Sequence, residues 1–271
     1  MSLPRIGVFD SGLGGLTVLK AMAEQIPAHY LYFGDTARLP YGTKSAETVA
    51  RYAIGAARFL GAQKIDLLVI ACNTATALAL PQITQSAGVP VIGVVEPGAA
   101  MAAELSQSRS AIVIATEATV SSHAYRDALQ RRGLAAYEKA CPLFVPLVEE
   151  GWIEHPVTEQ VARIYLGEAI AESADTADVL VLACTHYPLI APLLRRITPA
   201  HVKIVDSAES TARVVRRKLL GDQAASPLSG ALSDHRTFHF FVTDSVDKFK
   251  RLATGFLGRQ VDHVEHVDLG G

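Results

Sequence analysis

DLLVIACNTATAL at residues 66–78 and DVLVLACTHYPLI at residues 178–190 are two versions of one pattern. Each begins with an aspartate, continues as an aliphatic run and reaches Ala-Cys before small or polar residues. The two cysteines, Cys72 and Cys184, are separated by 112 positions, and so are the two aspartates. Aliphatic runs without polar alternation are typical of strands covered on both faces in a parallel sheet. The pattern therefore predicts two buried strands, each with a cysteine at its carboxyl end, where open α/β sheets bind ligands.

Further strand and helix patterns alternate around both segments. Each half of the chain has the order strand, helix, strand, long helix, cysteine strand, helix, strand. The expected strands are at 5–9, 30–33, 66–71 and 90–95 in the first half, and at 110–116, 137–142, 179–183 and 202–206 in the second. This alternation is typical of parallel sheets with crossover helices. We therefore expect an α/β fold of two pseudo-symmetric, open parallel-sheet (flavodoxin-like) domains that face each other across a cleft.

The residues after the second half are too few to fold alone. We expect them to return to the first domain, which gives residues 1–97 plus 210–271 as the first domain and 98–209 as the second. The tail pattern predicts a helix at 210–220, a surface loop at 221–234, a strand at FHFFV and a helix capped by Asp244 that ends before Gly258.

Composition narrows the class of protein. The chain has 271 residues, 49% hydrophobic against 19% charged, which suits two globular domains and excludes disorder. A net charge of −2 does not indicate the excess of positive charge that nucleic-acid binding requires. No run reaches the roughly 18–20 apolar residues of a membrane span. The N-terminus shows no secretion signal, so we expect a cytoplasmic protein. Three cysteines without CxxC spacing predict neither a disulfide framework nor a metal site, and Cys141 is interpreted as a buried apolar residue.

Two thiols on opposite sides of one cleft suit a reaction that removes a proton from one face of a carbon and returns one to the other. That reaction is racemisation by two bases. A thiol needs only a modest pKa change to exchange protons near neutral pH. Asp10 ends the first strand and His186 follows Cys184 by two positions, so each could assist a neighbouring thiol.

The substrate is expected to carry carboxylates. Small polar residues occupy four strand-to-helix turns, where free backbone N–H groups and hydroxyls bind anions: Ser11-Gly12, Asn73-Thr74, Thr116 with Thr119, and Thr185. The glycines of GLGG do not complete a dinucleotide fingerprint, because Thr17 stands at the third glycine position. No phosphate-binding loop of the GxxxxGK[ST] type is present.

Seven motifs, in this order, resemble the glutamate racemase family: FDSGLGGL, YFGDTARLPYG, ACNTAT, VEPG, FVPLVEEG, LACTHYPL and VDSAE. The resemblance covers nearly the whole chain and implies a cofactor-independent racemase that supplies D-glutamate for peptidoglycan. It implies that Cys72 acts on D-glutamate and Cys184 on L-glutamate. It further implies assistance from Asp10, His186 and Glu149, and a homodimer.

The resemblance also implies the substrate contacts. They are Asp10, Ser11, Tyr41, Gly42, Asn73, Thr74, Thr116, Thr119, Thr185 and His186. The family stretch that resembles ATEATVSS usually begins with glycine, where this chain has Ala115.

Three alternatives remain open from the sequence. Aspartate or another acidic amino acid presents the same two carboxylates as glutamate. A non-catalytic protein that binds carboxylates or regulates a partner could keep the fold, although both thiols are present. Cys184 and His186 could instead form a nucleophile and base for acyl transfer, which leaves Cys72 unexplained.

Overall fold

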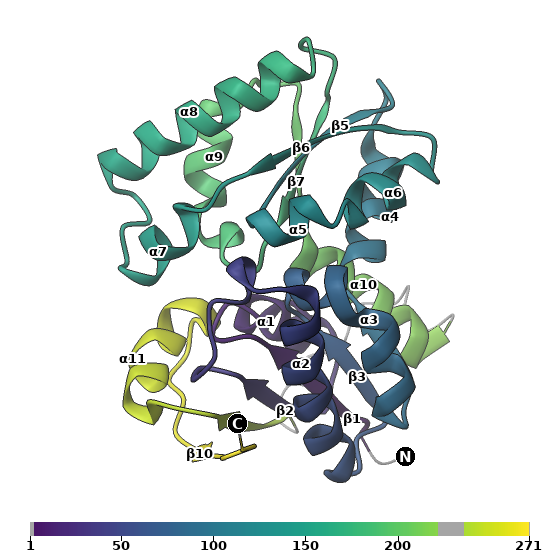
Figure 1. The fold of residues 1–271 in the computed structure, drawn as a ribbon, viewed down its shortest axis with the longest axis vertical. Coiled ribbons are helices and arrows are strands. Elements are labelled where there is room, and N and C mark those ends of the chain that lie inside the picture. Colours follow the sequence, from purple (N-terminus) through teal and green to yellow (C-terminus); the bar gives the residue numbers. More distant parts are fainter. Residues whose placement is uncertain (1–2, 222–235, 271) are drawn as a thin grey trace.

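Two parallel sheets form the framework of the computed structural model, which describes residues 3–221 and 236–270 (Figure 1). The six-stranded sheet has the order β10-β9-β2-β1-β3-β4, and the four-stranded sheet has the order β6-β5-β7-β8. The first consists of β1 (Arg5–Asp10), β2 (His29–Gly34), β3 (Leu67–Ile70), β4 (Val91–Gly93), β9 (Thr237–Val242) and β10 (Val264–His266). The second consists of β5 (Ser110–Ala115), β6 (Ala135–Ala140), β7 (Val179–Ala183) and β8 (Lys203–Asp206).

Helices connect the strands and cover both faces of each sheet. In the first half they are α1 (Leu16–Gln25), the short 3₁₀ turn η1 (Tyr41–Thr43), α2 (Ala46–Ala62) and α3 (Asn73–Ala87). In the second half they are α5 (Glu117–Ser121), α6 (Ala124–Gln130), α7 (Phe144–Glu149), α8 (Pro156–Glu172), the 3₁₀ turn η2 (Tyr187–Ile190) and α9 (Ala191–Ile197). Three further helices are α4 (Val95–Leu105), α10 (Ser207–Leu220) and α11 (Val246–Leu257).

The two halves share one strand order. The sequence β2-β1-β3-β4 in the first sheet corresponds to β6-β5-β7-β8 in the second, and every pairing is parallel. This order is that of flavodoxin-like sheets, which bind ligands where the chain direction reverses beside the first strand. The prediction of an α/β fold with two related parallel sheets is confirmed.

Successive side chains of the central strands alternate between two hydrophobic cores, which explains why the sequence of each strand is an uninterrupted apolar run. In β3, Val69 faces a core built with α1, whereas its neighbours Leu68 and Ile70 face a second core built with α2 and α3. In β7, Leu180 and Leu182 likewise belong to one core, and the intervening residues belong to another. Since both faces of each strand are covered, no polar position alternates within it.

Helices α4 and α10 carry the chain between the halves. The first follows β4 and leads to β5, and the second follows β8 and leads back toward β9; the two pack beside each other where the halves meet (Figure 1). β9 pairs with β2, so the tail adds strands to the first sheet, as Thr237 to Val242 lie opposite His29 to Gly34. The residue limits proposed for the two domains stay a prediction.

Two expectations for the tail differ from the structure. Helix α10 begins at Ser207 rather than near residue 210, because the Asp206 side chain accepts a hydrogen bond from the Glu209 N–H and caps it there. Asp244 does not cap α11: its carboxylate accepts from the Ser245 N–H outside the helix. The predicted surface loop at 221–234 lies outside the described residues from position 222 onward.

Within the described residues, no helix combines the length and apolar character that crossing a bilayer requires.

Candidate active site

A cavity of about 330 Å³ lies between the carboxyl ends of the two sets of strands. Both halves supply its walls, since the residues after β1 and β3 face those after β5 and β7. The predicted site residues that line it are Ser11, Tyr41, Gly42, Cys72, Asn73, Thr74, Thr116, Glu149, Cys184, Thr185 and His186. Two thiols from two different sheets therefore share one cavity, as the duplicated pattern predicted.

Cys72 lies at the start of α3, where its sulfur caps the helix. The Ala75 N–H donates to Sγ at 3.4 Å, and the Ser11 hydroxyl lies 3.4 Å from the same sulfur. Burial, together with the charge of Asp10, raises the pKa of Cys72 to about 12, although both hydrogen bonds act in the opposite direction. The raised pKa favours the thiol form of Cys72.

Cys184 has a different neighbour. Nδ1 of His186 lies 3.9 Å from its Sγ, and Nε2 of the same ring lies 3.2 Å from Oε1 of Glu149. Burial disfavours the imidazolium, but the contacts with Cys184 and Glu149 outweigh it and raise the pKa of His186 to about 10. The contact with His186 lowers the pKa of Glu149 despite its partial burial. The His186 ring thus lies between the sulfur of Cys184 and the carboxylate of Glu149.

Two predicted site residues do not line the cavity. Asp10 is buried behind Ser11, where its Oδ2 accepts the Gly12 N–H at 2.9 Å. Burial raises the pKa of Asp10. Its Oδ1 has no hydrogen-bond partner among the described residues. Asp10 therefore lies behind the cavity wall, from where its charge acts on Cys72.

Thr119 is the other such residue. Its hydroxyl lies 2.9 Å from that of Thr116 and 3.2 Å from that of Thr74, and the last two are 3.0 Å apart. Thr74 is the second residue of α3 in the first half, whereas Thr116 caps α5 in the second. The triangle of hydroxyls thus joins the halves at the cavity, with Thr119 supporting the two threonines that line it.

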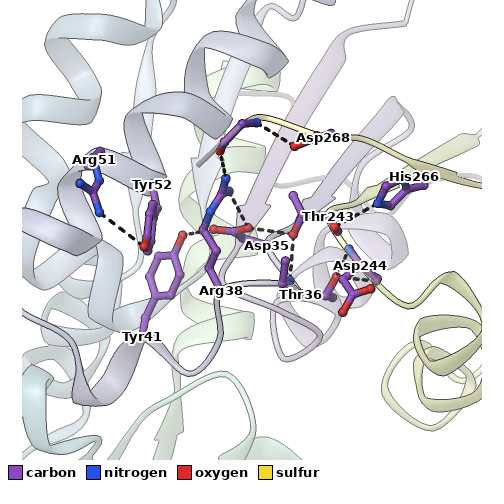
Figure 2. A network of polar contacts seen from close by, with 12 residues as sticks. Asp35, Thr36, Arg38, Tyr41, Arg51, Tyr52, Thr243, Asp244, His266 and Asp268 are labelled. Atoms are coloured by element: carbon purple, nitrogen blue, oxygen red, sulfur yellow. Dashed lines mark hydrogen bonds and ion pairs between the residues drawn. The ribbon is translucent and has the colours of Figure 1, made fainter.

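The wall at Tyr41 is fixed by a buried carboxylate beneath it (Figure 2). Asp35 accepts hydrogen bonds from Tyr41 at 2.5 Å, Thr243 at 2.8 Å and Arg38 at 3.1 Å. Arg38 also donates to the carbonyl of Gly270, so the end of the described chain is tied to this loop. The network holds η1 against the opposite half.

Several lining residues were not predicted. They are Leu39, Pro40, Thr43, Glu117, Pro142, Val145 and Pro146. Most form an apolar rim from the loop before Tyr41 and from the segment around α7. Leu39 and Pro40 lie within GDTARLPYG, and Pro142, Val145 and Pro146 lie within CPLFVP at residues 141–146.

None of the described residues that line the cavity is lysine or arginine. An anionic ligand would therefore be held by hydroxyls, amides, helix N-termini and the imidazolium of His186. Two thiols with access to one ligand can exchange protons with it from two directions.

Comparisons with known proteins agree with this geometry. The sequence matches the Asp/Glu/Hydantoin racemase family over residues 6–215. It is 60% identical to a glutamate racemase from Koribacter versatilis, across 99% of this chain and 98% of that protein. The structure is similar to a glutamate racemase from Francisella tularensis in complex with D-glutamate, with a TM-score of 0.87, 34% identity and 99% of each chain covered. It is also similar to a glutamate racemase from Thermus thermophilus in complex with beta-chloro-D-alanine, with a TM-score of 0.84, 42% identity and 98% and 97% coverage.

Proposed function

The chain belongs to the Asp/Glu/hydantoin racemase family, and on that premise we propose that it interconverts L-glutamate and D-glutamate. The observation that carries the proposal is that Cys72 and Cys184, supplied by different sheets, line one cavity. A base on each side of Cα allows the proton to leave one face and return to the other. The proposed reaction uses no cofactor.

In the direction from L-glutamate, the thiolate of Cys184 removes the Cα proton, and the electron pair moves into the α-carboxylate. The thiol of Cys72 then donates its proton to the opposite face. The step leaves Cys184 as a thiol and Cys72 as a thiolate, and the reverse sequence converts D-glutamate. His186, held by Glu149, stabilises the Cys184 thiolate as a neighbouring cation.

The first half assists its thiol differently. The Ala75 N–H at the helix N-terminus and the Ser11 hydroxyl both favour the Cys72 thiolate once its proton has left. Asp10 is close enough for its charge to act on Cys72, and we assign it a part in the exchange of this thiol's proton with solvent between turnovers. The two thiols thus receive help from a carboxyl group on one side and from an imidazolium on the other.

Hydroxyl and amide groups bind the two carboxylates of glutamate in this proposal. Asn73, Thr74 and Thr185 follow the two cysteine strands, so they suit the carboxylate attached to Cα. Tyr41, Gly42 and Thr116 form the facing wall and suit the side-chain carboxylate. Binding by neutral donors leaves the carbanion charge uncompensated except by His186 and the helix N-termini.

The wider setting is also proposed. We place the protein in the cytoplasm, as a supplier of D-glutamate for peptidoglycan and as a homodimer. Support for the dimer comes from the family resemblance and from exposed apolar side chains. Of the large ones in the described residues, four lie within 143–164: Leu143, Trp152, Val157 and Ile164.

Solvent deuterium incorporation tests the proposed function. The purified protein, without added cofactor, is incubated in D₂O with L-glutamate, D-glutamate or L-aspartate, and both optical rotation and label at Cα are followed. We expect both glutamate enantiomers to racemise with one deuterium incorporated into the product. Turnover of aspartate in place of glutamate, or product that carries no label, contradicts the proposal.

A further inference from the structure

The side chain of Asn73 is held from the second half of the molecule. Tyr125, in α6, donates a hydrogen bond from its hydroxyl to Oδ1 of Asn73 at 2.6 Å. Ser207, the first residue of α10, accepts from Nδ2 at 3.3 Å. Asn73 itself begins α3, directly after Cys72, and lines the cavity. The carboxamide next to one thiol is therefore oriented by contacts that cross between the halves.

Tyr125 can serve only as a donor in this place. Its side chain is fully buried, and among the described residues Asn73 is its one hydrogen-bond partner. If the carboxamide were reversed, Nδ2 would face the phenol and the hydroxyl hydrogen would have no acceptor, which is costly in a buried site. Burial also raises the pKa of Tyr125, which favours the protonated hydroxyl.

Gly98 lies beside the ring of Tyr125 and leaves space for it. A Cβ at Gly98, in α4, would lie 3.2 Å from both the hydroxyl oxygen and a ring carbon of Tyr125. Contacts that short require the ring to shift by a few tenths of an ångström. The glycine of the VEPG motif thus leaves the space in which the tyrosine hydroxyl reaches Asn73.

We infer that Tyr125 is a positioning residue, which fixes the carboxamide of Asn73 so that an N–H and not the C=O is presented to the substrate carboxylate. With Oδ1 engaged by Tyr125 and one N–H engaged by Ser207, the remaining group of the carboxamide is its second N–H. A reversed carboxamide would present a carbonyl oxygen to an anion. The inference rests on the proposed function, because it assigns Tyr125 a role in binding glutamate.

Steady-state kinetics of Tyr125→Phe test the role, with Tyr30→Phe as the matched control. Tyr30 is also buried and donates to the Ile26 carbonyl at 2.8 Å, but Ile26, unlike Asn73, does not line the cavity. Loss of one buried hydroxyl lowers the thermal stability of both variants. Only Tyr125→Phe is expected to raise KM for L- and D-glutamate, by about tenfold, with kcat changed by less than about threefold.

A double-mutant cycle with Asn73→Ala separates positioning from general destabilisation. If Tyr125 acts through Asn73, its replacement raises KM in the wild-type background but not in the Asn73→Ala background. Gly98→Ala provides a second perturbation that keeps the hydroxyl and displaces it, and it should raise KM less than Tyr125→Phe does.

The outcomes are distinct. An active wild-type protein in which Tyr125→Phe and Tyr30→Phe have the same KM overturns the inference alone, and so do equal effects of Tyr125→Phe in both backgrounds of the cycle. A folded wild-type protein that does not racemise glutamate overturns the proposed function and, with it, the inference.

Discussion

Replacing His186 with asparagine removes the cation beside Cys184 and keeps a polar side chain of moderate size. The imidazole lies 3.9 Å from the sulfur, and despite burial the contacts with Cys184 and Glu149 raise its pKa to about 10, so it is charged at neutral pH. Two unit charges about 4 Å apart attract by about 4 kcal/mol at an effective dielectric constant near 20. Loss of this attraction is expected to slow proton abstraction by Cys184 by up to about 10³-fold.

Part of this loss is recovered because a thiolate that is harder to form is also a stronger base. We therefore expect kcat/KM for racemisation to fall by between about 10-fold and 10³-fold. The two enantiomers have the same free energy in water, so the equilibrium constant is one and the ratio of kcat/KM in the two directions must remain one. A defect at one thiol lowers kcat/KM equally from L- and from D-glutamate, and racemisation rates cannot reveal which thiol was affected.

A one-sided reaction does reveal it. A glutamate analogue with a leaving group at Cβ loses HX after proton abstraction, without any proton donation to the other face. In His186→Asn, elimination from the L-analogue should fall by the same factor as racemisation, whereas elimination from the D-analogue, served by Cys72, should stay within about threefold of wild type. Equal losses for the two analogues would refute the assignment of His186 to Cys184.

Three further predictions concern the same cavity. Cys72→Ser and Cys184→Ser should each lower racemisation by at least about 10²-fold, yet retain elimination from opposite enantiomers of the analogue, as measured by HX release. Glu149→Gln should lower the pKa of His186 and move the alkaline limb of kcat/KM to lower pH. Because the pKa of His186 is raised on folding to about 10, its contribution to the free energy of unfolding is complete below pH ~6.5 and is lost as the pH rises through 10. In denaturation curves of Glu149→Gln, this loss of stability should begin at lower pH. Gly42→Ala places a Cβ 2.9 Å from the Cβ of Thr116, which lines the opposite side of the cavity. We therefore expect kcat/KM to fall by about 10²-fold while the melting temperature changes little.

The sequence predicts the framework well because its signal is local. Each cysteine strand is an uninterrupted aliphatic run, and such runs are covered on both faces in the structure. A cysteine that directly follows such a strand must lie at the sheet edge where the loops gather. Cys72, Cys184 and the polar residues after them could thus be assigned to one site before any contact was known.

The remaining features depend on how the halves dock, which no local pattern records. Nothing in the sequence indicates that Tyr125 reaches Asn73, or that Thr119 lies behind Thr116 rather than on the cavity wall. The sequence does not indicate the apolar rim either, since Pro142 and its neighbours line the cavity only because the segment around α7 faces the first half. Asp10 was predicted correctly as the end of a strand, but its burial behind the cavity follows from the tight turn after it.

The offset of 112 positions also pairs the residues after the two cysteines, and there the halves have diverged. Thr74 corresponds to His186: the threonine joins a triangle of hydroxyls, whereas the histidine joins a charged row with Glu149. The duplicated strands therefore place the two sulfurs alike, but only Cys184 has an adjacent cation, and burial beside a carboxyl group raises the pKa of Cys72. In the proposed mechanism, Cys184 is the base for L-glutamate and Cys72 is the base for D-glutamate. Because the raised pKa of Cys72 opposes loss of its proton, a single-turnover experiment with both enantiomers should consume L-glutamate before D-glutamate.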